Sequence, residues 1–181
     1  MSFVVRGLDG AGLRQLAAHL HPIYRECFAA PPWNEPAEKI ADFPVRLARH
    51  TAHPGAYGWV AEQDGEILGA VYGWPAPAAL PAANAFDIAI REAAPPDVAA
   101  LLVAPAMVVA ELMVLPTHQG RGVGRELLAR QVGDHPAWLA THPEAAAVRL
   151  YERAGWKRRF SYQVEDRPLT LFTRAAAPTG R

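Results

Sequence analysis

The sequence contains one cysteine, Cys27, and no net excess of positive or negative charge among its 181 residues. A single cysteine excludes an intramolecular disulfide and fits a reducing compartment, so we expect a cytoplasmic protein with Cys27 as a buried structural thiol. The 18 basic residues balance 18 acidic ones, whereas a protein that holds a long nucleic acid usually has a basic excess. We therefore expect no nucleic-acid partner.

The sequence also lacks a hydrophobic run long enough to cross a bilayer. The longest apolar run, residues 98–110, contains Pro105 and is shorter than a membrane span. The N-terminal residues lack the basic and apolar regions of a signal peptide. The 7 histidines do not combine with cysteine or carboxylates at metal-ligand spacing. These absences predict no membrane partner and no metal site.

The hydrophobic fraction of 51% is typical of a soluble globular protein. A chain of this length is sufficient for one well-buried core. We expect one domain over residues 1–174, followed by a disordered tail over residues 175–181.

Local patterns predict the order of helices and strands. Helical spacing of apolar residues predicts a helix over residues 13–28, with Asp9 as its cap and Pro22 as a kink or division. The pair Asp64–Gly65 between two apolar runs predicts a hairpin in the interior of a sheet. The other predicted strands and helices are strands over residues 2–6, 57–63, 66–74, 106–114, 138–141, 156–163 and 168–173, and helices over about 36–50, 125–132 and 143–154. Residues 75–105 give no clear pattern.

Three glycines at alternate positions, Gly120, Gly122 and Gly124, separate an expected strand from an expected helix. Glycine permits backbone conformations and close approaches that side chains prevent. Unpaired backbone N–H groups at a helix N-terminus favour an anion such as a phosphate. A nucleotide P-loop would need Gly-Lys-Ser/Thr, and a dinucleotide fingerprint would need its third glycine one residue later. A tight turn that binds nothing is the remaining alternative.

The segment ELMVLPTHQGRGVGRELL, residues 111–128, resembles the acetyl-coenzyme A (acetyl-CoA) signature of the GNAT-type N-acetyltransferase superfamily. The segment LYERAGW, residues 150–156, resembles the second signature of that family, with Trp156 in place of phenylalanine. The resemblance implies an α/β (α+β) single-domain fold, with a central mixed, mostly antiparallel sheet that is splayed at the acetyl-CoA site and flanked by helices. It also implies an N-acetyltransferase that moves an acetyl group from acetyl-CoA directly to a primary amine.

The resemblance assigns roles to particular residues. Backbone groups of the strand would pair with the pantetheine arm, the Val114 N–H would stabilise the oxyanion, and the loop amides would hold the pyrophosphate. The cofactor-binding residues expected on this basis are Leu112, Met113, Val114, Gln119, Gly120, Arg121, Gly122, Val123, Gly124 and Arg125. The Tyr151 hydroxyl would donate a proton to the departing thiolate, although spacing alone fits an aromatic core residue.

The attacking amine must lose a proton, and Glu111 is the leading candidate base by the same resemblance. The alternative is a carboxylate at the strand edge without a chemical role. His118 and His142 are weaker candidates that we expect on solvated loops. Glu144 stands where many family members have asparagine, and we interpret it as part of a capping box with Thr141.

The acceptor is not identified by any motif. It is expected to be a small-molecule amine or a peptide or protein amine, and the protein a monomer or homodimer. Acidic side chains could favour a cationic amine, but scattered acids on helices are mostly solvated; these are Glu26, Glu35, Glu38 and Asp42. Two alternatives stay open: a non-catalytic acyl-CoA sensor with the same fold, and an acyltransferase that uses a longer acyl-CoA.

Overall fold

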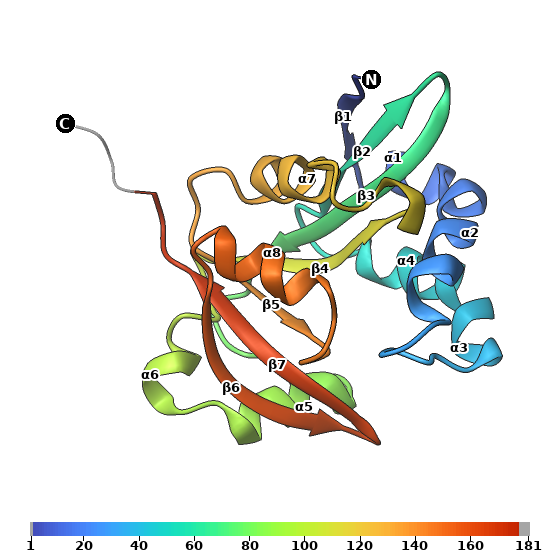
Figure 1. Ribbon diagram of the computed structural model, residues 1–181. Coiled ribbons are helices and arrows are strands. Elements are labelled where there is room, and N and C mark those ends of the chain that lie inside the picture. Colours follow the sequence, from blue (N-terminus) through green and yellow to red (C-terminus); the bar gives the residue numbers. More distant parts are fainter. Residues whose placement is uncertain (1, 178–181) are drawn as a thin grey trace. The chain divides into compact units, whose positions relative to one another are not determined.

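The computed structural model describes residues 2–177. The chain forms two compact units, residues 1–74 with 109–133 and residues 75–108 with 134–181 (Figure 1). The first unit contains β1 (Val4–Asp9), α1 (Gly10–Gln15), α2 (Ala17–Phe28), α3 (Ala37–Ala41), α4 (Phe43–His50), β2 (Tyr57–Gln63), β3 (Glu66–Pro75, all but its last residue), most of β4 (Met107–Val114), the 3-10 turn η1 (Pro116–His118) and α7 (Val123–Val132).

The N-terminal helices follow the predicted pattern but divide at other residues. The Asp9 side chain accepts a hydrogen bond from the Gly12 N–H at 2.8 Å, which confirms the predicted cap. The first division is at Leu16, whose N–H donates to the Leu13 carbonyl and closes α1 after one tight turn. Pro22 lies inside α2, so the helix is not divided there, and the alternative of a kink at Pro22 stays a prediction. The predicted helix over 36–50 is also divided, into α3 and α4.

The two faces of the sheet in the first unit carry different helices. Successive side chains of a strand point to opposite faces. Val60 of β2 belongs to the core with residues of α1, α2, α3 and α4, whereas the Arg130 guanidinium of α7 lies 5.8 Å from the ring centroid of Trp59. The Tyr57 hydroxyl also donates to the Gln131 carbonyl of α7 at 2.5 Å. Helix α7 therefore covers the face opposite α1–α4, as Figure 1 shows.

The carboxyl end of β4 lies tightly against β3 in the first unit. The Leu115 N–H donates to the Leu68 carbonyl at 2.8 Å. A Cβ at Gly69 would lie 2.6 Å from the Met113 carbonyl oxygen, so only glycine fits there. Because backbone groups alternate in direction along a strand, those of Met113 and Leu115 face β3, and those of Leu112 and Val114 face away from it.

The second unit begins with residues 75–105, where no helix or strand was predicted. Its elements are α5 (Ala85–Ala93), α6 (Pro96–Ala99), the first two residues of β4, β5 (Ala137–Thr141), α8 (Ala147–Arg153), β6 (Lys157–Val164) and β7 (Arg167–Arg174). The Asn84 side chain caps α5 by accepting from the Asp87 N–H at 3.0 Å. Of the predicted tail, residues 175–177 form neither helix nor strand, and 178–181 lie outside the described residues.

The start of α8 differs from the prediction. A helix over 143–154 with a Thr141–Glu144 capping box is wrong, because Thr141 ends β5 and α8 begins at Ala147. The Glu144 N–H donates instead to the His142 Nδ1 at 3.1 Å. The Ala145 N–H donates to the His142 carbonyl at 3.0 Å, so residues 142–145 form a turn.

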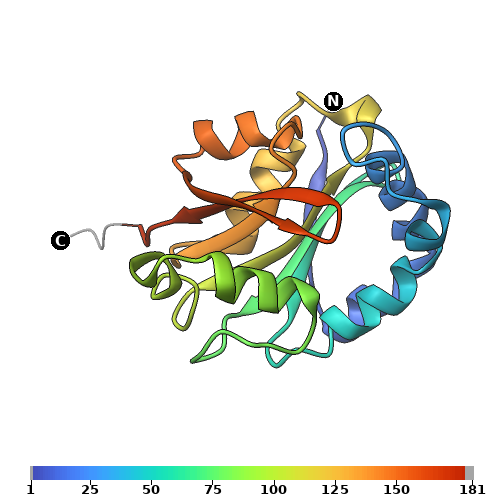
Figure 2. The ribbon, with the colours of Figure 1, turned by 90° about the horizontal axis from the view of Figure 1, so that it is seen from below.

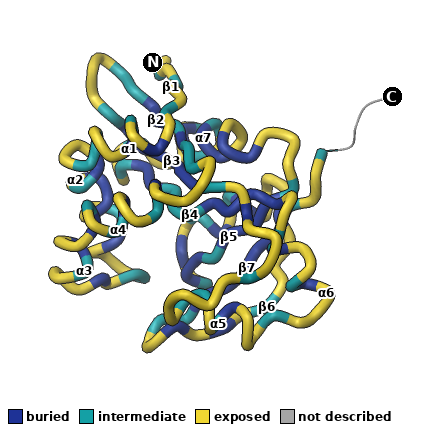
Figure 3. The backbone as a smooth tube through the Cα atoms, turned by 180° about the vertical axis from the view of Figure 1, so that it is seen from behind, coloured by how far each residue is buried: buried dark blue, intermediate teal, exposed yellow. Residues whose placement is uncertain are grey.

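The strands form a seven-stranded mixed sheet in the order β1-β2-β3-β4-β5-β7-β6. The pairs β1–β2, β2–β3, β5–β7 and β6–β7 are antiparallel (Figure 2). The parallel register of β4 with β5 consists of Met107↔Ala137 and Val108↔Trp138. The predicted mixed, mostly antiparallel sheet flanked by helices is confirmed. In Figure 3 the strands β3, β5 and β7 carry runs of buried residues.

Candidate active site

The burial of the β4 residues varies along the strand. Its first three and last two residues are buried, but Ala110, Glu111 and Leu112 are only half-buried. This is the part of β4 that lies beyond the two positions paired with β5. The candidate base Glu111 and the candidate pantetheine-binding residue Leu112 therefore both lie on a partly open part of the strand.

The glycine loop that follows β4 presents unused hydrogen-bond donors. Gly120 and Gly122 have φ values of +73° and +87°, which favour glycine, and a Cβ would meet no atom within 4 Å at either position. The first bond of α7 runs from the Glu126 N–H to the Gly122 carbonyl at 3.0 Å. Within residues 2–177, the amides from Gly120 to Arg125 donate no hydrogen bond. The loop is therefore an anion-binding arrangement at a helix N-terminus.

The side chains of the loop divide into three kinds. Arg121 and Arg125 are exposed and can supply positive charge near the amides. Val123 is 2% exposed, so only its backbone can contact a ligand. The Gln119 side chain is already used, because its Nε2 donates to the Val114 carbonyl at 3.0 Å and ties the loop to the end of β4.

The same Val114 carbonyl accepts from the Cys27 Sγ at 3.3 Å. Burial, which the hydrogen bond to Val114 opposes, raises the pKa of the Cys27 thiol to about 12. Because the thiolate is the reactive form, Cys27 is not a nucleophile at neutral pH. Cys27 is half-buried rather than fully buried, and its structural role stays a prediction.

Tyr151 lies in the second unit, on α8. It is 5% exposed, and its ring packs 6.0 Å from that of Trp156 and 5.8 Å from that of Phe172. This packing holds the ring in the core. The aromatic core role expected from spacing is therefore present, and it is compatible with a second role for the hydroxyl.

The two histidines considered as alternative bases differ in exposure. His118 is half-buried in η1, with its Nδ1 3.0 Å from the Thr117 hydroxyl. His142 is 8% exposed, so its predicted place on a solvated loop is wrong. The reason is its role in the turn after β5, where its Nδ1 accepts from the Glu144 N–H.

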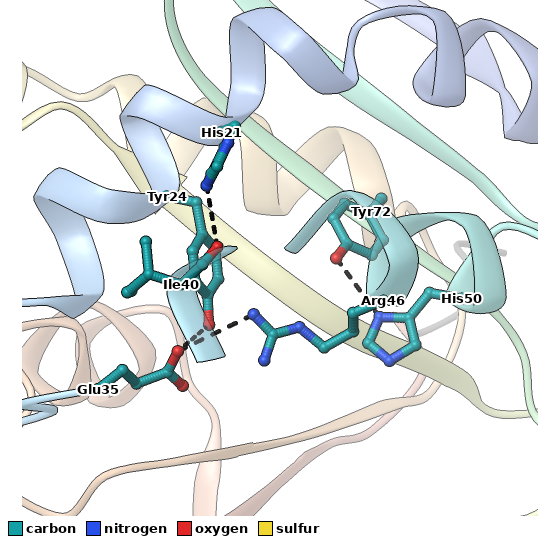
Figure 4. A network of polar contacts seen from close by, with 7 residues as sticks. All are labelled: His21, Tyr24, Glu35, Ile40, Arg46, His50 and Tyr72. Carbon is teal, nitrogen blue, oxygen red and sulfur yellow. Dashed lines mark hydrogen bonds and ion pairs between the residues drawn. The ribbon is translucent and has the colours of Figure 1, made fainter. Parts of the chain in front are cut away.

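A buried charged cluster in the first unit lies near Glu111. The Tyr24 hydroxyl donates to the Glu35 Oε2 at 2.5 Å, and the Arg46 Nη2 lies 3.9 Å from the same oxygen (Figure 4). Burial, followed by the charge of Glu111, raises the pKa of Tyr24, so its hydroxyl keeps its proton. Burial disfavours the charge of Arg46, but Glu111, Tyr24 and Glu35 outweigh it and raise the pKa of Arg46.

His50 lies on the same helix as Arg46, at the other end of this cluster. Its Nδ1 is 3.4 Å from the Tyr72 hydroxyl, and its ring is 5.2 Å from that of Trp74. Burial, followed by the positive charges of Arg46 and Arg49, lowers the pKa of His50 to about 3. His50 is therefore neutral at physiological pH.

Because the pKa of His50 is lowered in the folded state, we expect the protein to lose stability in acid. Its folded pKa of about 3 lies below an unfolded value of about 6.5, so its stabilising contribution is complete above pH 6.5 and is lost as the pH falls toward 3. Between pH 7 and pH 5 this residue should account for a loss of about 2 kcal/mol. Denaturant unfolding at both pH values should show a smaller loss in His50→Gln, while the exposed-site control His19→Gln behaves like the parent. Equal losses in the parent and His50→Gln would contradict this assignment.

Comparison with known proteins places these features in a family. The model of the acetyltransferase (GNAT) family matches residues 17–156, well over half of the chain. The chain belongs to the GNAT family. The match includes β4, the glycine loop and Tyr151, and it ends at Trp156. No curated protein is significantly similar to the chain in sequence.

Solved structures share the GNAT fold at low sequence identity. A structure from Corynebacterium glutamicum, described as histone acetyltransferase HPA2 and related acetyltransferase, has a TM-score of 0.67 and 20% identity over 99% of this chain and 100% of its own. The PaiA N-acetyltransferase of Thermoplasma acidophilum, in complex with coenzyme A, has a TM-score of 0.65 and 13% identity over 97% and 99%. The protein yncA of Salmonella typhimurium, solved with its cofactor acetyl-CoA, has a TM-score of 0.59 and 19% identity over 100% and 98%.

Sequence reasoning missed part of this GNAT protein's charged cluster. Glu35 was expected among solvated acids but is 7% exposed, because it is enclosed with Tyr24 and Arg46. A usable signal was present in α4, where Arg46 and His50 are four residues apart beside the buried positions Phe43 and Leu47.

Among residues 2–177, no helix is long and apolar enough to span a bilayer, and no three ligand-type side chains cluster as a metal site.

Proposed function

We propose that this GNAT protein is an N-acetyltransferase that transfers an acetyl group from acetyl-CoA to a primary amine. The observation that carries the proposal is the row of unused amides from Gly120 to Arg125 at the start of α7. A pyrophosphate is an anion of the size and charge that such a row binds. The acceptor would be a small-molecule amine or a peptide or protein amine of the cytoplasm.

The residues present fit this cosubstrate. The loop has no side chain where phosphate oxygens would approach Gly120 and Gly122, and Arg121 and Arg125 add charge. Because the backbone groups of Leu112 and Val114 face away from β3, these two residues are better candidates for the pantetheine arm than Met113. The Val114 carbonyl is already bonded to Gln119 and Cys27, which leaves its N–H for the arm or the oxyanion.

The catalytic roles follow from the chemistry of amide formation. Glu111 would take a proton from the acceptor ammonium, directly or through water, because only the neutral amine has a lone pair for attack. The Val114 N–H would stabilise the negative oxygen of the tetrahedral intermediate. As the carbon–sulfur bond breaks, the Tyr151 hydroxyl would donate a proton to the departing thiolate. The nitrogen of the new amide would release its extra proton to the Tyr151 oxygen, directly or through water, which restores the tyrosine.

The function is tested by measuring thiol release from acetyl-CoA with a panel of primary amines. Amine-dependent release, with the N-acetyl product found by mass spectrometry, supports the proposal. Binding of acetyl-CoA without any turnover would instead support a sensor domain. Faster release from propionyl-CoA or longer thioesters would indicate an acyltransferase that prefers a longer donor.

The substitution Gly122→Asp should weaken acetyl-CoA binding at least about tenfold, because it places a negative charge beside the pyrophosphate amides. The open space around Gly122 should leave the fold intact apart from strain at its positive φ. Gly65→Asp is the matched control, because Gly65 has a φ of +83° and equally open surroundings in the β2–β3 turn. Titration calorimetry should separate the two variants. Equal affinity in folded Gly122→Asp and the parent would remove the loop from the coenzyme site.

A further inference from the structure

Arg46 has an unusual environment for a largely buried charge. Its side chain is 17% exposed, and its Nε and Nη2 are buried without a hydrogen-bond partner. Within the part of the chain that the structure describes, the Arg46 Nη1 also makes no hydrogen bond. Unlike Nε and Nη2, this atom is not fully buried, so it reaches the surface. A guanidinium with N–H donors on three nitrogens is therefore held at the surface edge of the cluster with no acceptor.

Such a group is costly unless something completes its hydrogen bonds. Charged donors that lose water without gaining an acceptor destabilise a fold more than neutral ones. Unsatisfied buried polar groups are rare in native proteins, and a bound ion, water or ligand is one common explanation. Arg46 is thus a candidate for a ligand contact.

The neighbours of Arg46 hold the guanidinium without engaging its donors. The Tyr24 ring covers one face of the guanidinium, 4.6 Å from the ring centroid to Cζ. The Glu35 Oε2 lies 3.9 Å from Nη2, which is beyond hydrogen-bond distance, and its side chain is 2% exposed. Figure 4 shows Arg46 extending from α4 toward Glu35, between the Tyr24 and Tyr72 hydroxyls. Glu35 therefore supplies a counter-charge that a ligand cannot reach, and the accessible edge of Arg46 stays available.

The negative charge of Glu111 also acts on Arg46 and favours the protonated guanidinium. We propose, building on the acetyl-transfer function above, that Arg46 binds an oxyanion group of the acceptor. The acceptor is then an amine that also carries a carboxylate or a similar acid, with its ammonium at Glu111 and its oxyanion at Arg46. A planar guanidinium matches two oxygens of one such group, and it recognises them more specifically than an ammonium does.

The test compares amino acids with their amides, which have similar size but lack the carboxylate. β-Alanine with β-alaninamide and 4-aminobutyrate with 4-aminobutyramide give two spacings between amine and acid. The parent should prefer the acid by about 10–100-fold in kcat/KM, as expected for charge-assisted hydrogen bonds. The preference should disappear in Arg46→Met. It should fall in Arg46→Lys, which keeps the positive charge but loses the planar pair of N–H donors that matches two oxygens. Taurine and phosphoethanolamine, compared with ethanolamine, identify the preferred oxyanion.

Arg49→Met is the matched control, because Arg49 is an exposed arginine on the same helix, and it should keep the preference for acids. Should Arg46→Met fold poorly, the double variant Arg46→Met/Glu35→Gln removes both charges of the ion pair and should lose the preference as well. A preference for acids that survives in a folded Arg46 variant overturns the proposal. So does a parent that acetylates amides as fast as acids.

Binding separates this inference from the acetyltransferase function. With coenzyme A present, β-alanine or 4-aminobutyrate should raise the melting temperature of the parent more than the amide does, and the difference should vanish without Arg46. That result without any acetyl transfer would retain the Arg46 site and reject the enzymatic function. Acetyl transfer without any difference between acids and amides would retain the function and reject the Arg46 site.

Discussion

Replacing Tyr151 by phenylalanine is expected to slow the chemical step of acetyl transfer by about 10²-fold while acetyl-CoA affinity stays close to that of the parent. General-acid catalysis is typically worth about 10²–10⁴-fold, and a thiolate leaves fairly well without help, so the lower end applies. The ring contacts with Trp156 and Phe172 do not need the hydroxyl. A role limited to packing therefore predicts a rate close to that of the parent.

Single-turnover transfer at saturating acceptor is the appropriate measurement, because product release then cannot hide the chemical step. Tyr162→Phe is the matched control: Tyr162 is a tyrosine of β6, 8% exposed, whose hydroxyl is buried without a hydrogen-bond partner in the described residues. Removing that hydroxyl should leave the rate unchanged and the fold at least as stable. A Tyr151→Phe rate equal to that of Tyr162→Phe would remove Tyr151 from the mechanism.

The parts of the fold that the sequence predicted well are set by local backbone requirements. Gly122 and Gly133 have positive φ values and flank α7. The helix ends at the predicted residue and begins two residues before the predicted start at 125. The Asp64–Gly65 turn likewise joins β2 and β3 with the predicted boundaries within one residue. In each case a few neighbouring residues decide the conformation, so a short segment carries the information.

The parts that were missed depend on contacts between distant segments. Glu35 is buried because a tyrosine from α2 and an arginine from α4 enclose it. The spacing of α4 indicates that Arg46 faces the core, but it does not indicate that Glu35 is its neighbour. The start of α8 was misplaced because the His142 side chain forms a turn that replaces the expected cap. The extent of a single domain over residues 1–174 stays a prediction.

The largest expected loss of activity comes from replacing Glu111, the candidate base. Replacing Glu111 by glutamine is expected to lower kcat at neutral pH by about 10²–10³-fold, because the amide cannot accept the proton of the attacking ammonium. Acetyl-CoA affinity should change little, since the loop amides that hold the pyrophosphate lie beyond the end of β4. The half-buried place of Glu111 on the strand gives it access to both solvent and the buried cluster.

The pH profile distinguishes a base from a merely structural carboxylate. In the parent, the rate should fall on the acid side as Glu111 takes up a proton, and this limb should be absent from the residual activity of Glu111→Gln. Glu66→Gln, at the exposed start of β3, is the strand carboxylate control and should keep both rate and limb. Because the charge of Glu111 acts on Arg46 and Tyr24, the unfolding free energy of each variant must be measured alongside the rate. A folded Glu111→Gln variant with the parent's rate and acid limb would leave Glu111 a structural residue and pass the search for the base to His118 and His142.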